Sequence, residues 1–334
     1  MKKVLYFLLA ACIVLGSCTT GGDTAAAAAM ILGGSSQSPV FLGCRTVSEN
    51  EIEFEFSQPV KITSLRFEPA ITVASIENGS IVRVQIEESQ QPGMMFTADL
   101  LAQDDSKNTI NVLISFRARN NRMPKLQINE FRTEYSNPRV EFIELKLITS
   151  GNLGAMRVFM AGGSQKPTIY EFSPVEVKEG EYILLHLRKR ENECIDEYGD
   201  NLALSGGTGS SPTARDIWIP GTAKLINKTG FLYVLDQDDN VLDAVMFSEK
   251  PDPWWTKDYL AEAAEFLYSK GAWKSAKGSI CSPADAVAST STTATRTICR
   301  DETTANTNTA ADWYITVTSG NTPGTRNNPN RFAP

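Results

Sequence analysis

Histidine is almost absent from this sequence, because only His186 carries an imidazole among 334 residues. Catalytic pairs that need a histidine base, with serine or cysteine as nucleophile, would all depend on this one residue. His186 follows two leucines in an apolar strand pattern, where a histidine is more often packed than catalytic. The GxSxG, HExxH and phosphate-loop motifs are also missing. We therefore expect no enzyme and no cofactor.

Cysteine is scarce, and its spacing does not suit metal binding. The six cysteines include no CxxC pair, so the usual zinc-ligand spacing is absent. Removal of Cys12 with a signal peptide and acylation of Cys18 would leave four cysteines, which allow three disulfide pairings. Among these pairings we favour Cys281 with Cys299, which closes a short loop. Four buried free thiols are an equal alternative.

Positive charge is in short supply, with 32 Lys and Arg against 39 Asp and Glu. The formal charge of −7 becomes −9 when Lys2 and Lys3 leave with a signal peptide. Such a chain gains nothing from neutralising phosphates, so we expect no nucleic-acid partner. The composition, 42% hydrophobic and 21% charged, is typical of a globular protein, and 334 residues favour two domains.

Long hydrophobic runs are confined to the first residues. Lys2 and Lys3 precede an apolar stretch that is too short to span a bilayer, and Leu15-Gly16-Ser17-Cys18 resembles a bacterial lipoprotein cleavage box. We expect a signal peptide over 1–17 and palmitate or similar acyl groups on Cys18. These would fix the chain to a membrane of the bacterial cell envelope. Thr19, directly after the acylated cysteine, favours the outer membrane, by analogy with lipoprotein sorting in enteric bacteria. The sequence leaves open whether the protein faces the periplasm or the cell surface.

After a Gly-, Ser- and Ala-rich tether over 18–39, the hydrophobic pattern acquires a period of two. Alternating stretches around Phe54, Val84 and Val112 predict half-buried strands, and Asn78-Gly79 predicts a hairpin. Many short strands without helices indicate an Ig-like β-sandwich over 40–120. Phe56-Ser57-Gln58-Pro59-Val60 is similar to the FSxPV strand end of bacterial Ig-like domains.

A polar break at 117–124 separates this segment from a second run of strands. The succession INEF, EFIEL, VKEGEYILL, LYVLDQDDNVLDAVMF and DWYITVTSGNTPGTRN resembles a lamin-tail domain, which implies a second Ig-type sandwich over 125–332. Two insertions, at about 194–223 and 249–279, depart from that pattern. The predicted fold class is all-β: two Ig-like sandwiches in series, the second carrying a helical insertion.

The second insertion contains the one convincing helix pattern. Thr256 is suited to cap its start, and Lys270-Gly271 marks its stop. We expect the helix to lie across one end or edge of the second sandwich. Aromatic residues cluster there, and Trp254, Trp255, Tyr259 and Trp273 are candidates for a platform that binds sugars or peptides. Packing of these rings against the sheet is the alternative that we favour.

Acidic residues give two further candidates. Asp236, Asp238 and Asn240 place hard oxygens at alternate positions in a turn, as calcium prefers, but such residues also simply form turns, which we favour. Glu141 and Glu144 are three apart on a strand and point to opposite faces, so we interpret them as decoration of a solvated surface.

These patterns favour a membrane-anchored, non-catalytic binding or scaffolding module. Its partner would be an envelope protein or a glycan. A calcium-assisted hydrolase and a purely structural spacer are the alternatives. The resemblance to lamin tails also implies association with filaments, nucleic acid or membranes, of which the acidic charge disfavours nucleic acid.

Overall fold

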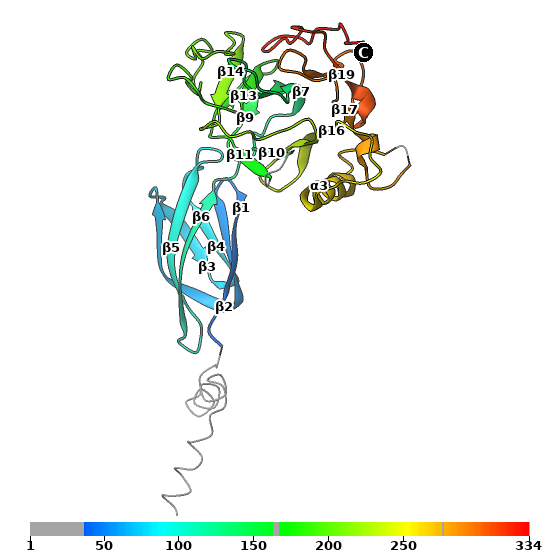
Figure 1. Cartoon of the computed structure of the whole chain (residues 1–334). Coiled ribbons are helices and arrows are strands. Elements are labelled where there is room, and N and C mark those ends of the chain that lie inside the picture. The colour runs from blue at the N-terminus through cyan, green and yellow to red at the C-terminus, as the bar shows by residue number, and fades with distance from the viewer. Residues whose placement is uncertain (1–36, 163–166, 276, 334) are drawn as a thin grey trace, which may run out of the picture. The chain divides into compact units, whose positions relative to one another are not determined.

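The computed structural model describes residues 37–162, 167–275 and 277–333 (Figure 1). Strands dominate this part of the chain, and it contains a single α-helix, so the predicted all-β class is confirmed. None of the described helices has the length and apolar character to cross a membrane. By contacts the chain divides into two compact units, which meet in sequence between Ala118 and Arg119, while residues 91–94 group with the second.

The first unit is built around one very long strand. Its strands are β1 (Phe41–Ser48), β2 (Glu51–Glu68), β3 (Val73–Glu77), β4 (Gly79–Ile86), β5 (Met95–Gln103) and β6 (Thr109–Arg117). The first half of β2 pairs with β1 and β4, and its second half pairs with β5, all antiparallel. Alternate residues turn inward and bury five phenylalanines, namely Phe54, Phe56, Phe67, Phe96 and Phe116. The ring of Phe116 contacts three of the others.

The second unit contains two larger sheets and a two-stranded one. One sheet has the order β14-β13-β8-β7-β18-β19, the second has the order β11-β10-β15-β16-β17, and β12 pairs with β9. The strands are β7 (Leu126–Arg132), β8 (Phe142–Leu147), β9 (Gly151–Asn152), β10 (Arg157–Gly162), β11 (Thr168–Glu171), β12 (Glu176–Val177), β13 (Tyr182–His186), β14 (Ala214–Trp218), β15 (Gly230–Leu235), β16 (Val241–Ser248), β17 (Val287–Ala288), β18 (Ile298–Arg300) and β19 (Trp313–Ile315). Two 3-10 turns, η1 (Pro283–Asp285) and η2 (Ala310–Asp312), complete the unit.

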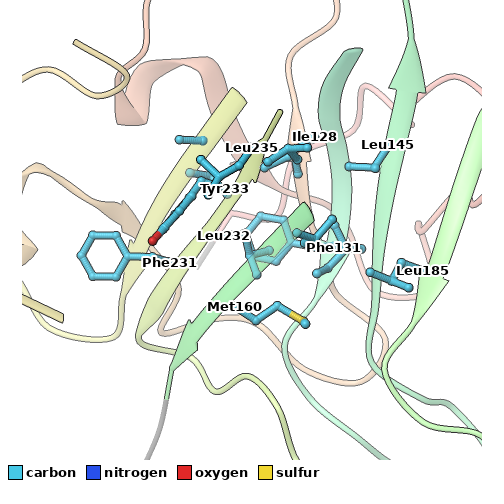
Figure 2. Close-up of a cluster of buried hydrophobic side chains, with 14 of the residues drawn as sticks. Ile128, Phe131, Leu145, Met160, Leu185, Phe231, Leu232, Tyr233 and Leu235 are labelled. Atoms are coloured by element: carbon cyan, nitrogen blue, oxygen red, sulfur yellow. The ribbon is translucent and has the colours of Figure 1, made fainter. Parts of the chain in front are cut away.

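The core of this unit lies between its two larger sheets. Figure 2 shows Ile128 and Phe131 of β7, Leu145 of β8 and Leu185 of β13 on one side, with Met160 of β10 and residues of β15 on the other. Every residue of β15 is buried, which is the pattern of a strand covered on both faces.

The helix α3 (Asp258–Ser269) provides the second cover. It contacts β10 and β15, and its Phe266 ring lies 5.5 Å from the ring of Tyr233. Leu260, Ala263, Ala264 and Leu267 of the helix are buried. The helix therefore covers a face of the sheet, so our placement at an end or edge is wrong. The residue at its N-cap is Lys257 rather than Thr256, and no side chain caps it.

Candidate functional site

A groove opens beside the start of α3, where the second insertion meets the loop before β15. Its volume is about 570 Å³, and we call it the insertion groove. The side chains that matter for its chemistry are Lys224, Lys228, Lys250, Trp254, Trp255 and Lys257. Two of the predicted platform residues therefore lie in a concave site together with cations that the sequence analysis did not assign.

The two tryptophans of the groove are held differently. The Trp255 indole Nε1–H donates to the Cys281 carbonyl at 2.8 Å, and its ring lies 4.6 Å from that of Phe231. Trp255 is therefore a fixed, half-buried wall. Trp254, by contrast, is 68% exposed. Adjacent tryptophans in an extended segment point different ways, which leaves one of them in solvent.

The other two platform candidates do not belong to the groove. Trp273 is only 1% exposed, and its Nε1–H donates to the Asp285 carbonyl at 3.1 Å, so its inclusion in an exposed platform is wrong. Tyr259 is half-buried and packs against the core. For these two residues the packing alternative holds, because α3 needs their bulk to cover the sheet.

The cations of the groove fall into two pairs. Lys224 Nζ lies 3.5 Å from Glu134, and Lys228 Nζ lies 3.9 Å from Glu249, so both have carboxylate partners. Lys250 and Lys257 are exposed, and neither ammonium is in an ion pair within the described chain. Lys257 also stands at the N-terminus of α3, where backbone N–H groups carry partial positive charge.

The acidic turn between β15 and β16 does not gather calcium ligands. The carboxylate of Asp236 accepts from the backbone N–H groups of Asp238 and Asn240 at 2.8 and 2.9 Å. Asp238 forms a bidentate pair with Arg119 at 2.6 Å for both bonds, and this guanidinium lowers the pKa of Asp238. Within the described residues no three His, Cys, Asp or Glu side chains are grouped to hold a metal ion. The hydrogen bonds of Asp236 are those of a polar turn, which was the alternative to a calcium site in the sequence analysis.

The four cysteines beyond the tether, Cys44, Cys194, Cys281 and Cys299, are all free thiols in this structure. Cys281 and Cys299 are buried at 1% and 0% exposure. Burial raises the pKa of the Cys281 thiol to about 11, which keeps it protonated at neutral pH. The favoured Cys281–Cys299 bridge is therefore not formed, and the alternative of free thiols describes the structure.

His186 is packed, as expected, but with a partner that sequence analysis missed. Its Nε2 lies 2.7 Å from Asp216 Oδ1, and its ring stacks on Trp218 at 3.7 Å. Burial lowers the pKa of His186, because hydration of the imidazolium is lost. Asp216 also accepts from the Ser211 N–H at 2.9 Å. The His186–Asp216 pair thereby ties the first insertion to the sheet. His186 itself is only 1% exposed.

Glu141, just before β8, and Glu144, within it, are inside the protein, so our interpretation of them as solvated decoration is wrong. Both are 0% exposed. Glu141 accepts two bonds from Arg188, at 2.6 and 2.7 Å. Glu144 faces Glu130 across the β7–β8 pair. All but one of the residues of β8 are buried, because distant segments of the chain also cover the outer face of this strand.

Glu130 and Glu144 hold the C-terminal segment against the sheet. Glu144 accepts from the Gly324 N–H at 2.6 Å and from Asn129 Nδ2 at 2.8 Å. Glu130 accepts from the Thr322 N–H at 3.0 Å. Burial raises the pKa of both carboxyls, and for Glu144 the charge of Glu130 adds to the effect. No local pattern marks these two residues in the sequence.

Comparison with known proteins places the second unit in a family. Residues 124–315 match the family described as "TP_1001_2nd: protein second domain". The chain belongs to this TP_1001 second-domain family. The matched range begins just before β7 and ends with β19, so the insertion groove, His186 and the buried glutamates all lie within the TP_1001 second domain.

Two individual proteins are also similar. An uncharacterized protein of Treponema pallidum (strain Nichols) is 27% identical over 214 residues, which is 60% of this chain. The match covers 53% of the Treponema protein, so this chain spans about half the length of that relative. A crystal structure of a DUF4876 family protein from Bacteroides thetaiotaomicron aligns with 83% of this chain and 94% of its own, at 12% identity and a TM-score of 0.28. A likeness this weak carries no argument.

Proposed function

We propose that this protein is a lipid-anchored envelope lipoprotein whose second unit is a non-catalytic binding module. Cys18 is the proposed acylation site and the outer membrane the proposed location, both from the sequence around the cleavage box. The proposed partner is an envelope protein or a glycan. The family match and the two β-rich units fit this proposal, but it is carried by the insertion groove.

The decisive observation is an exposed indole in a concave site. Trp254 leaves 68% of its surface in solvent beside the fixed ring of Trp255, within a groove of about 570 Å³. Volumes of this size are typical of ligand sites, and tryptophan is among the residues most enriched where binding energy concentrates. A side chain this large contributes to stability when it is buried, so its exposure favours a role in binding.

The alternatives lack a comparable observation. A structural spacer has no use for an exposed indole over a groove. A hydrolase needs an accessible base, whereas the His186–Asp216 pair is enclosed at 1% and 0% exposure. The acidic turn proposed for calcium-assisted hydrolysis has its carboxylates committed to Arg119 and to backbone N–H groups.

The test is the association of the full-length Cys18→Ala protein, which carries no acyl groups on that residue, with isolated envelopes that lack the protein. Trp254→Ala removes the exposed indole without touching the core, and we expect the association constant to fall by about tenfold or more, as for a hot-spot residue. Tyr198→Ala is the matched control, because Tyr198 is 49% exposed and lies in the first insertion. Equal co-sedimentation with and without the Trp254→Ala change in this background would refute the proposal.

A further inference from the structure

We infer that the insertion groove binds an acidic oligosaccharide, that is, a sugar chain bearing carboxylate, sulfate or phosphate groups. This inference rests on the proposed binding function and deepens it by naming the chemical class of the ligand. It depends on three features that meet in the groove: flat aromatic faces, cations without partners, and polar side chains between them.

The tryptophans supply the surface that a sugar ring requires. An indole carries negative charge on its face, which attracts the weakly positive C–H groups on the flat side of a pyranose. Trp255 is positioned in advance by its bond to the Cys281 carbonyl and by its contact with Phe231, so it loses little freedom on binding. Trp254 also lines the groove and leaves 68% of its surface exposed, so its ring face is available to a second sugar unit.

Unpaired cations flank the two indoles along the chain. Lys250 precedes Trp254 by four positions, and Lys257 follows Trp255 by two. Neither ammonium is neutralised by a carboxylate in the described chain, unlike those of Lys224 and Lys228. One free lysine on each side of the two tryptophans suits a ligand whose sugar rings stack on the indoles and whose substituents carry negative charge.

The balance of charge in the groove also favours an anion. Its four lysines outnumber the three carboxylates that line it, from Glu134, Glu249 and Asp252, whereas the whole chain has a formal charge of −7. Thr256, Lys257 and Leu260 line the groove at the start of α3, a twelve-residue helix that no side chain caps. Its N-terminal partial charge adds to that of the lysines, while Asp258 in the first turn offsets part of it.

Hydroxyl and amide groups complete the chemistry. Asn227 and Thr256 also line the groove. A carboxamide and a hydroxyl both donate and accept, as sugar hydroxyl groups do. An acidic peptide would use the lysines but would gain little from the indole faces, so we favour the sugar chain.

The test measures the binding of defined oligosaccharides to the full-length protein in detergent by calorimetry. The probes are tetragalacturonate for carboxylate, a heparin tetrasaccharide for sulfate, a phosphorylated mannose oligosaccharide for phosphate, neutral cellotetraose, and a hexaglutamate peptide. We expect at least one acidic oligosaccharide to bind about tenfold or more tightly than cellotetraose and hexaglutamate, with affinity that falls as salt rises. Equal binding of the neutral sugar, tighter binding of the peptide, or no binding of any acidic sugar would overturn the inference.

Variants show whether the groove is responsible. Lys250→Gln with Lys257→Gln removes both free charges, and we expect affinity for the acidic sugar to fall by about tenfold or more, with a smaller salt dependence. Lys125→Gln with Lys189→Gln is the matched control, since both lysines are exposed, form no ion pair within the described chain and lie outside the groove. Unchanged affinity in the groove variant would reject the site. If Trp254→Ala weakens envelope binding while no acidic sugar binds, the proposed function survives and only the ligand class fails.

Discussion

Asp243 and Arg300 each leave only 4% of their side chains exposed, with 2.6 Å between the carboxylate and the guanidinium. Asp243 also accepts from the Ile128 N–H at 2.6 Å, so it joins three strands at one oxygen. Charges buried this deeply are tolerated only when they are paired, and loss of one partner typically costs about 3–5 kcal/mol. At the residue scale, the interior of the second unit is therefore organised by polar contacts as well as by apolar packing.

Glu144 makes the stability of this interior dependent on pH. Its folded-state pKa is raised by burial, with the charge of Glu130 adding to the effect, so the folded chain keeps the proton to higher pH than the unfolded chain. The free energy of unfolding should then decrease as pH rises above the ordinary glutamate pKa, until the folded pKa is passed. His186 contributes a pH dependence of the opposite sign, because burial lowers its pKa. Since His186 is present in every variant, its contribution cancels when the stabilities of two variants are compared.

The measurement compares wild type with Glu144→Gln by urea unfolding at about pH 5 and about pH 7.5. Relative to the variant, wild type should be more stable at the lower pH and lose this advantage at the higher one. Glu265→Gln, on the exposed side of α3, is the control. A pH dependence of the Glu144 variant equal to that of the control would contradict the assignment.

At the element scale, α3 belongs to the core of the second unit. Leu267 is 0% exposed within the cluster that fills the space between helix and sheet. We expect Leu267→Ala to reduce the free energy of unfolding by about 2–5 kcal/mol, because it leaves a cavity in a packed interior. Glu265→Ala on the exposed side should change it by less than about 0.5 kcal/mol. Chemical denaturation checks both, and similar stabilities would show that the helix is only appended.

Local patterns in the sequence predicted individual helices and strands better than they predicted which segments pack against them. The pattern from Tyr259 to Leu267 predicted the helix, and alternation predicted β2, β4 and β6. The dipeptide Asn78-Gly79 predicted a hairpin, and the strands on either side of it, β3 and β4, do pair antiparallel. What covers a strand depends on segments far away in the chain, which explains why β15 was not recognised as buried on both faces and why Glu144 was placed in solvent.

Only part of the candidate site was predictable, because the sequence shows local clusters of residues but not the distant segments that join them. The run from Trp254 to Trp273 is visible in the sequence as an aromatic cluster, but only the structure shows that Trp254 is the exposed residue among the four platform candidates. Lys224 and Lys228 join the groove from before β15, a juxtaposition that only the fold creates. The burial of Trp273 likewise follows from tertiary packing beyond α3, which no local period encodes.

At the scale of the whole molecule, the proposed function needs the groove to be held at a membrane, and Cys18 is the residue that decides this. Cys18 lies outside the described residues, so the prediction depends on the sequence alone. Cys18→Ala should abolish labelling by radioactive palmitate and shift the protein out of the membrane fraction, because multiple acyl chains on one cysteine supply the attachment.

Cys44→Ala is the matched control for Cys18→Ala, because Cys44 lies on β1 as a free thiol within the folded part of the chain. It should keep both the label and the membrane location. If the Cys18 variant stays labelled, another residue carries the lipid. If it loses the label but remains in the membrane fraction, the groove itself provides the attachment, and Trp254→Ala in the same background should then release the protein.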